Sequence, residues 1–243
     1  MMKVEVLGIK IDQVTYQEAL EKVKRILETK GKHYIVTPNP EIIVAAQKDA
    51  EFKNILNKAD LSLADGAGLI KLARLTGRHF PERIAGVDFV EGLAGLAQEF
   101  NYNIFLLGGK ENVAKIAAEN LKKRLPKLKI AGTFAGKSEE ASDKETLGVL
   151  SKEEIDILIV AYGHGKQEKW IKSNLKKLDV KVAIGVGGAL DYISGRKRRA
   201  PKFVQKANLE WLFRLLIEPW RVRRQLALPY FVYLILKERI FKR

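Results

Sequence analysis

One aspartate has the residue type and the setting of a catalytic base. Asp65 follows the short apolar run at residues 61–64 and begins the sequence Asp-Gly-Ala-Gly. In α/β proteins, a polar residue at the carboxyl end of a strand faces the edge of the sheet where ligands bind. Burial there raises the pKa of a carboxyl group toward the range useful for proton transfer. The sequence leaves two roles open for Asp65: a general base, or a cap for the helix that follows.

Two other predicted turns carry residues suited to a sugar and a phosphate. Thr37 and Asn39 follow a short apolar run, and their side chains could bind sugar hydroxyls or serve only the turn and the next helix cap. Arg83 lies in the basic loop at residues 76–86. There it could neutralise a phosphate leaving group through two hydrogen bonds, with a solvated loop arginine as the alternative.

Glycine-rich turns follow several predicted strands. They are Gly108-Gly109, the turn at residues 163–168, and the Gly-Val-Gly-Gly turn formed with Gly185, Gly187 and Gly188. Glycine lets backbone amides approach a phosphate closely, although such turns also occur for packing alone. None is a complete GxGxxG or Walker motif, which argues against an NAD-dependent oxidoreductase. Together the turns favour one nucleotide crevice shared by several strand ends.

The sequence predicts no metal ion and no cofactor. It contains no cysteine, and its three histidines lack metal-ligand spacing. No paired-aspartate DxD element occurs either. The absence of cysteine also suits a reducing cytoplasm, and the first residues lack the apolar region of a secretory signal peptide, so we expect a cytoplasmic protein.

Alternating strands and helices must position these turns. Apolar runs of strand length alternate with amphipathic stretches of roughly 10 to 15 residues. This pattern predicts an α/β domain at residues 1–195, with a mostly parallel sheet covered by helices on both faces. The opening residues 3–12 alternate like one strand. We expect the ligand-binding loops to gather at one edge of the sheet.

The end of the chain has a different composition. Residues 196–243 hold 14 Lys and Arg against three Glu, which gives +11 of the formal net charge of +15. We predict that this appendage is helical from Phe203 to Ile217 and, after a break at Glu218-Pro219, from Trp220 to Lys242. Its charge indicates an anionic partner, either a nucleic acid or a membrane surface.

Apolar and aromatic residues between the cations favour the membrane surface. The longest apolar run, residues 226–236, contains Pro229 and is far shorter than the roughly 20 residues needed to cross a bilayer. We therefore expect a basic amphipathic appendage that lies on a membrane. A helical subdomain packed on the sheet and an oligomer contact remain as alternatives. From another functional class, the alternative is a nucleic-acid-binding α/β protein with a basic helical tail.

Six segments, in the same order along nearly the whole chain, resemble one protein family. They are TPNPE at 37–41, ADGAG at 64–68, ERIAGVDF at 82–89, YGHGKQEKWI at 162–171, GVGGALDYISGRKRRAP at 185–201 and LEWLFRLLIEPWRVRRQ at 209–225. Together they are similar to the bacterial N-acetylmannosaminyltransferases, which act in the synthesis of wall teichoic acid, enterobacterial common antigen or related polymers.

The resemblance implies a fold and a reaction. The fold would be a Rossmann-like α/β arrangement, and the enzyme would need no metal. UDP-N-acetylmannosamine would donate its sugar, with inversion, to the 4-hydroxyl of N-acetylglucosamine on undecaprenyl diphosphate. UDP would be released.

The resemblance also implies roles for individual residues. Asp65 would deprotonate the acceptor hydroxyl, while Thr37 and Asn39 would line the sugar pocket. Arg83 would contact the diphosphate in place of a metal, and Gln167 would hold the nucleotide-sugar. The Gly-Val-Gly-Gly turn would contact uridine or phosphate.

In the appendage, three arginines match those of the family. Arg221 and Arg224, three residues apart on one helical face, would bind the lipid diphosphate, and Arg214 would also bind substrate. We expect the active site to be complete only when the appendage folds over the sheet edge, with the enzyme peripheral on the inner face of the cytoplasmic membrane. A homo-oligomer is a further expectation. The chain departs from the family at Gly165, where the family's element has proline.

Overall fold

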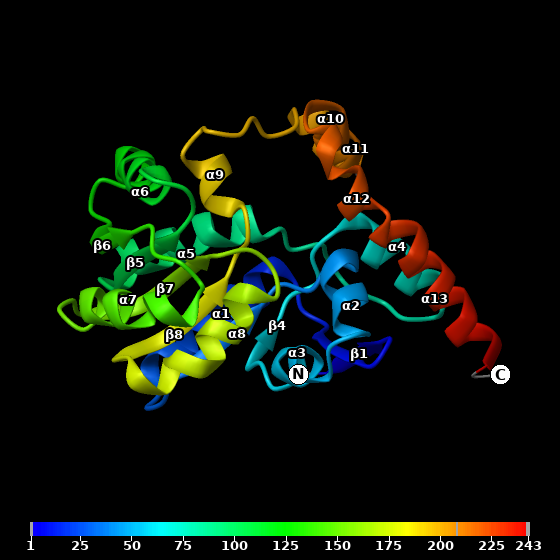
Figure 1. Ribbon diagram of the computed structural model, residues 1–243, viewed down its shortest axis with the longest axis horizontal. Coiled ribbons are helices and arrows are strands. Elements are labelled where there is room, and N and C mark those ends of the chain that lie inside the picture. Colours follow the sequence, from blue (N-terminus) through cyan, green and yellow to red (C-terminus); the bar gives the residue numbers. More distant parts are fainter. Residues whose placement is uncertain (1, 208, 242–243) are drawn as a thin grey trace.

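A parallel sheet forms the centre of the protein (Figure 1). The computed structural model describes residues 2–207 and 209–241, apart from the side chains of residues 140, 206, 223 and 241. The strands of the sheet are β3 (His33–Val36), β4 (Leu61–Ser62), β5 (Asn103–Gly108), β6 (Lys129–Phe134), β7 (Ile155–Ala161) and β8 (Val180–Gly185). Their order is β4-β3-β8-β7-β5-β6, and each neighbouring pair is parallel. The predicted mostly parallel α/β sheet is confirmed.

Helices cover both faces of this sheet, as the sequence predicts. One face packs against α1 (Tyr16–Glu28), α5 (Gly86–Phe100), α6 (Val113–Arg124) and α9 (Ala189–Ile193). The other packs against α2 (Pro40–Ala46), α3 (Ala50–Asn57), α4 (Ala67–Leu75), α7 (Asp143–Leu150) and α8 (Lys166–Asn174). Two short 3-10 helices, η1 (Glu140–Ser142) and η2 (Leu175–Lys177), complete this part of the chain.

The central strands are apolar on both sides because each side faces a core. In β7, Ile157 and Ile159 belong to one core, whereas Leu158 and Val160 belong to the other. All four side chains are fully buried. Continuous apolar runs of this kind are typical of parallel strands with helices on both faces.

The alternation of the opening residues predicts a single strand, and this prediction is wrong. These residues form an antiparallel hairpin of β1 (Lys3–Val6) and β2 (Ile9–Asp12), separate from the main sheet. The turn places Leu7 at φ 51° and Gly8 at φ 77°. Positive φ at both central residues gives the backbone twist that two-residue hairpins require, and this reverses the chain.

The appendage is wholly helical, with more interruptions than expected. Its elements are α10 (Lys202–Lys206), α11 (Glu210–Ile217), the 3-10 helix η3 (Pro219–Arg221), α12 (Val222–Gln225) and α13 (Ala227–Phe241). The predicted break at Glu218-Pro219 is confirmed. The first predicted helix is divided in two, because α10 ends at Lys206 and α11 begins at Glu210. Pro229 lies in the first turn of α13, where its missing N–H costs little; Lys242 lies outside the described residues.

The last helix joins the core of the body. α13 lies along α2 and α4 (Figure 1), and Phe231 and Ile235, one turn apart, are buried there. Leu228, on the same face, reaches Gly68 of α4, where an added Cβ would lie 2.9 Å from the leucine Cδ1. At the other end, Arg78 Nη2 lies 2.7 Å from Glu238 Oε2. The division at residue 195 stays a prediction, but α13 and the body share one core.

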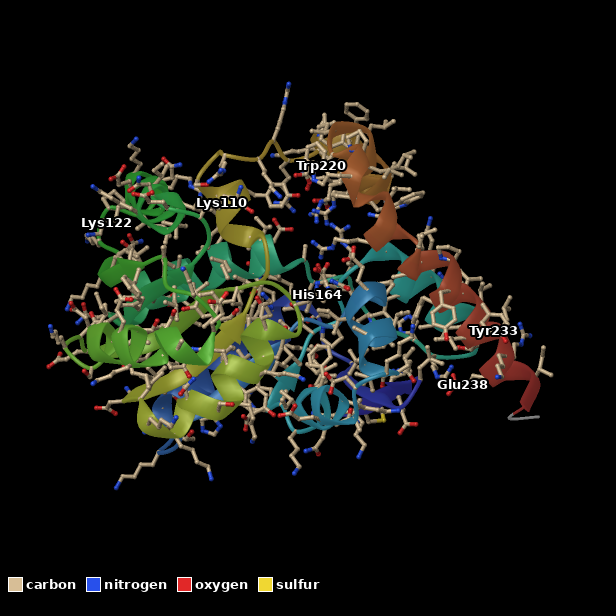
Figure 2. The ribbon with its side chains drawn as sticks, in the orientation of Figure 1. Lys110, Lys122, His164, Trp220, Tyr233 and Glu238 are labelled. Carbon is tan, nitrogen blue, oxygen red and sulfur yellow. The ribbon has the colours of Figure 1, made fainter. Side chains whose placement is uncertain are left out.

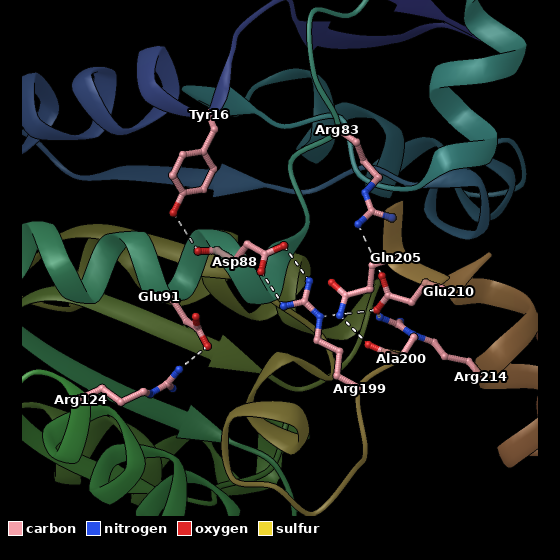
Figure 3. Close-up of polar contacts among 10 residues, drawn as sticks. All are labelled: Tyr16, Arg83, Asp88, Glu91, Arg124, Arg199, Ala200, Gln205, Glu210 and Arg214. Carbon is pink, nitrogen blue, oxygen red and sulfur yellow. Dashed lines mark hydrogen bonds and ion pairs between the residues drawn. The ribbon is translucent and has the colours of Figure 1, made fainter. Parts of the chain in front are cut away.

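Ion pairs fix the basic linker, residues 196–201, to the body and to the break before η3. Arg199 donates two hydrogen bonds to the Asp88 carboxylate on α5, at 2.5 and 2.7 Å (Figure 3). Lys197 Nζ lies 3.0 Å from Glu218 Oε1, just before η3. Arg196 and Arg198 are exposed. Of the four consecutive cations at residues 196–199, Lys197 and Arg199 are therefore paired, whereas Arg196 and Arg198 are exposed.

Replacing Phe231 by Ala removes a ring that is 0% exposed. We expect a cost of about 3–5 kcal/mol in the free energy that holds α13 to the body, because a buried cavity remains. Amide hydrogen exchange in α13 should become correspondingly faster, while β7 stays protected. Leu236→Ala, on the exposed face of the same helix, is the matched control. Equal exchange in the two variants would contradict the docking of α13.

Candidate active site

A cavity of about 820 Å³ lies at the carboxyl edge of the sheet, between the body and the appendage. The body contributes residues that follow the strands: Thr37, Asp65, Gly109, Tyr162 and Val186. The appendage contributes residues from α11 to α13, among them Glu210, Arg214, Arg221, Arg224 and Leu228. Figure 2 shows Lys110 and His164 on the body and Trp220 on the appendage. The structure thus brings both parts of the chain to one site.

Asp65 lies in this cavity and does not cap the next helix. The N-cap of α4 is Gly66, at φ 92°, and α4 has no side-chain cap hydrogen bond. Burial raises the pKa of Asp65 above its ordinary value. Arg214 and Arg83 act in the opposite direction, as does a hydrogen bond from the Gly86 N–H, whereas Glu210 raises the pKa further. An ionised Asp65 is therefore a stronger base than a solvated aspartate.

Thr37 and Asn39 also line the cavity, but each has a structural bond. The Thr37 hydroxyl donates to the Gly185 carbonyl at 3.3 Å and so connects the ends of β3 and β8. Asn39 is the N-cap of α2, and its Oδ1 accepts from the Ile42 N–H at 3.0 Å. Asn39 therefore caps α2, one of the roles that the sequence left open, and it also lines the cavity.

The glycines divide into two groups. Gly109, Gly187 and Gly188 line the cavity. Gly108 and Gly185 lie behind them, where the backbone or a side chain leaves no room for a Cβ. A Cβ on Gly108 would lie 2.8 Å from the Ala161 backbone, and one on Gly185 would lie 2.7 Å from Gln167 Nε2. These two glycines therefore permit close packing beneath the site.

Gln167 is buried and holds the last glycine turn. Its Oε1 accepts from the Gly187 N–H at 2.8 Å, and its Nε2 donates to Glu168 Oε1 at 2.8 Å. The other Glu168 oxygen accepts from the Gly165 N–H at 2.6 Å. Gly165 has φ +80°, which proline cannot adopt. The glycine at the family's proline position thus permits a different turn, in which Gln167 is held at both ends of its amide.

Glu168 is a residue that the sequence analysis missed. It is fully buried, and burial raises the pKa of its carboxyl group. The hydrogen bonds that the carboxylate accepts offset part of this rise. A signal was present in the sequence, because a glutamate at the third position of a helix can accept a hydrogen bond from the N–H of the N-cap residue, here Gly165.

Arg83 and Arg214 meet at one carboxylate. Glu210 Oε1 lies 2.6 Å from Arg214 Nη2, and Glu210 Oε2 lies 3.5 Å from Arg83 Nη2 (Figure 3). The Arg214 guanidinium also lies over the Tyr192 ring, 4.8 Å from its centroid. A body arginine and an appendage arginine are thus held in the same wall of the cavity, beside Asp65.

The other two predicted arginines line the same cavity. Arg221 Nη1 lies 3.2 Å from Glu218 Oε2. Arg224 Nη2 lies 2.7 Å from Glu41 Oε2 and 3.0 Å from His164 Nδ1. Burial and then Arg224 lower the pKa of His164, so its ring is neutral near pH 7 and Nδ1 accepts the hydrogen bond. The contacts with Glu41 and His164 connect the appendage to the body.

Among residues 2–207 and 209–241, no group of three or more His, Cys, Asp or Glu side chains could hold a metal ion. The cations that line the cavity, and so could bind a diphosphate, are the arginines already described together with Lys110, Lys137, Arg196 and Lys197. That the reaction needs no metal stays a prediction from the sequence.

Comparisons with known proteins agree over nearly the whole chain. The sequence profile described as "Glycosyl transferase WecG/TagA/CpsF family" matches residues 4–243. An N-acetylglucosaminyldiphosphoundecaprenol N-acetyl-beta-D-mannosaminyltransferase of Bacillus subtilis (strain 168) is 35% identical over 88% of this chain and 83% of its own. A protein of the same name from Staphylococcus aureus (strain MRSA252) is 31% identical over 97% of this chain and 92% of its own.

These relatives give no support to the nucleic-acid-binding alternative. The profile and the relatives cover both the α/β body and the appendage that together line the cavity. The chain belongs to the WecG/TagA/CpsF family of glycosyl transferases.

Proposed function

We propose that this protein transfers N-acetylmannosamine from UDP-N-acetylmannosamine to the 4-hydroxyl of N-acetylglucosamine on undecaprenyl diphosphate. The main support is a carboxylate of raised pKa that shares one cavity with arginines from the body and the appendage. The acceptor and the transferred sugar follow the names of the relatives. The UDP-linked donor follows the family resemblance, and the product would enter wall teichoic acid or a related surface polymer.

In the proposed reaction, Asp65 accepts the proton of the acceptor hydroxyl. The hydroxyl oxygen then forms a bond to C1 of the donor sugar, on the face opposite UDP. The bond between C1 and the β-phosphate oxygen breaks, and UDP leaves with the electron pair. Inversion at C1 follows because attack and departure occur on opposite faces.

The charge that develops on the β-phosphate needs stabilisation. Arg83 lies in the wall beside Asp65 and supplies a planar guanidinium suited to a phosphate. Such donors act strongly in a site with restricted water access. We propose that Arg83, and not a metal, stabilises the charge on the β-phosphate.

Thr37, Asn39 and the glycine turns would bind the donor. Thr37 and Asn39 would line the sugar pocket, although each already makes a structural hydrogen bond. The backbone amides around Gly109, Gly187 and Gly188 face the cavity and suit the nucleotide phosphates. Gln167 supports the last turn through its bond to Gly187.

The acceptor is a lipid, and we propose that the appendage binds it at the membrane surface. Arg214, Arg221 and Arg224 face the cavity, where they would contact the lipid diphosphate. The appendage exposes large apolar residues, Phe203 73%, Leu216 72%, Trp220 72% and Leu226 62%, of which Trp220 also lines the cavity. Apolar groups next to cations suit an anionic bilayer surface. This arrangement supports a location on the inner face of the cytoplasmic membrane.

Among the described residues, no helix is both long and apolar enough to span a bilayer. The proposed homo-oligomer has no separate support from the structure, and sedimentation with and without detergent would test it.

Asp65→Asn should reduce turnover by about 10²- to 10⁴-fold, because an amide cannot accept the acceptor's proton. The measurement is UDP release from UDP-N-acetylmannosamine with a short-chain lipid-diphosphate-N-acetylglucosamine acceptor, in the presence of EDTA. Asp179→Asn, at an exposed position after η2, is the matched control and should keep full activity. An Asp65→Asn enzyme as fast as the parent protein would disprove the assignment of the base.

Leu216→Glu and Trp220→Glu should weaken membrane binding, because each places a charge on the proposed bilayer-facing side. In a flotation assay, the parent protein should rise with phosphatidylglycerol-containing vesicles, and the double variant should stay behind. Ile116→Glu changes an exposed apolar residue of α6 in the body and should float like the parent. A parent protein that does not float, or an Ile116→Glu protein that fails equally, would refute the proposed surface.

A further inference from the structure

Glu210 is a buried carboxylate that no role described so far requires. It is the first residue of α11, it lines the cavity, and it is 6% exposed. A charge at such a position is costly unless other charges compensate for it. Its retention inside the site of the proposed transferase therefore needs an explanation.

Three arginines from three segments surround Glu210 (Figure 3). Arg214 of the same helix lies 2.6 Å from Oε1, and Arg199 Nε of the linker lies 3.9 Å from the same oxygen. Arg83 Nη2, from the loop before α5, lies 3.5 Å from Oε2. One carboxylate thus fixes two long side chains of the appendage and one of the body.

Two of these arginines line the cavity with Asp65 and act electrostatically on it. Arg214 and Arg83 both lower the pKa of Asp65, and Glu210 raises it. These three side chains are the charged groups that act on Asp65 from α11 and from the loop before α5. A guanidinium close to a lone carboxylate tends to form an ion pair, which stabilises the ionised form and weakens it as a base.

We propose that Glu210 is a positioning residue that keeps Arg83 and Arg214 from pairing with Asp65. It binds both guanidiniums at the cavity wall, so they remain available to a diphosphate while Asp65 remains available to a proton. This inference rests on the proposed function, in which Asp65 is the base. It adds an anionic residue from the appendage to the machinery of the transfer.

Glu210 also joins catalysis to the docking of the appendage. Its contact with Arg83 crosses from α11 to the body. When α11 lies away from the body, Arg83 loses this partner and is free to pair with Asp65.

The test compares Glu210→Gln with Glu218→Gln in the full-length protein. Glutamine keeps the shape and an acceptor oxygen but removes the charge. Glu218 is the matched residue, because it also pairs with an appendage arginine in the cavity wall yet does not act on Asp65. We expect Glu210→Gln to lower kcat by roughly tenfold or more, with a smaller effect on the donor KM.

The pH profile separates positioning from a purely structural role. Loss of the negative charge lowers the pKa of Asp65, so the acid limb of kcat/KM should move to lower pH in Glu210→Gln and stay in place in Glu218→Gln. Glu210→Asp should restore the position of the limb. A thermal melt of each variant checks that it is folded.

An unmoved acid limb in folded Glu210→Gln would overturn the proposal, as would full activity in that variant. Asp65→Asn, measured in the same assays, distinguishes a failure of the proposed role of Glu210 from a failure of the proposed function of Asp65. If Asp65→Asn is inactive and the limb does not move, only the role of Glu210 is wrong. If Asp65→Asn is active, the proposed function of Asp65 and the role of Glu210 both fail.

Discussion

Charge removed from bulk water must be compensated at close range, and this constraint governs the whole site. Asp65, Glu210, Arg83 and Arg214 share one wall of the cavity. Each would be unfavourable there alone. Together they leave a carboxylate with a raised pKa beside guanidiniums that are already oriented.

The fold meets this constraint by bringing distant segments to one place. Parallel strands deliver the ends of β3, β4, β5, β7 and β8 to the same edge, which supplies the base and the glycine turns. The strands do not supply the residues that cover this edge. The appendage supplies them, because α13 buries Phe231 and Ile235 in the body and so brings α11 and α12 over the edge.

Much of this could be predicted from the sequence. The alternation of apolar runs and amphipathic stretches predicts the sheet, and the position of Asp65 after a strand predicts its place at the edge. Composition did not reveal how the appendage is used. Cations dominate the charge of the appendage, and composition does not show that Glu210 and Glu218 hold its arginines in the cavity wall. Long-range pairing of this kind leaves no local pattern in a sequence.

Other differences between the predictions from the sequence and the structure have local causes. Phe231 and Ile235 are four residues apart and so share one helical face, but an apolar face next to cations suits a membrane as well as a core. The hairpin turn at Leu7 and Gly8 was hidden because a leucine rarely adopts positive φ. Gln167 was assigned to the ligand on resemblance, whereas its bonds to Gly187 and Glu168 also make it a support for the turn.

The central claim is that an appendage cation lies beside the base of the body. Carboxyl ¹³C titration by NMR tests it, with the Asp65 signal assigned by its loss in Asp65→Asn. In the parent protein, the pKa of Asp65 should lie above that of a solvated aspartate, because burial raises it. In Arg214→Gln, the pKa should rise further, because a cation that lowers it is gone. An unchanged pKa in Arg214→Gln would show that the appendage does not reach the base and would contradict the account.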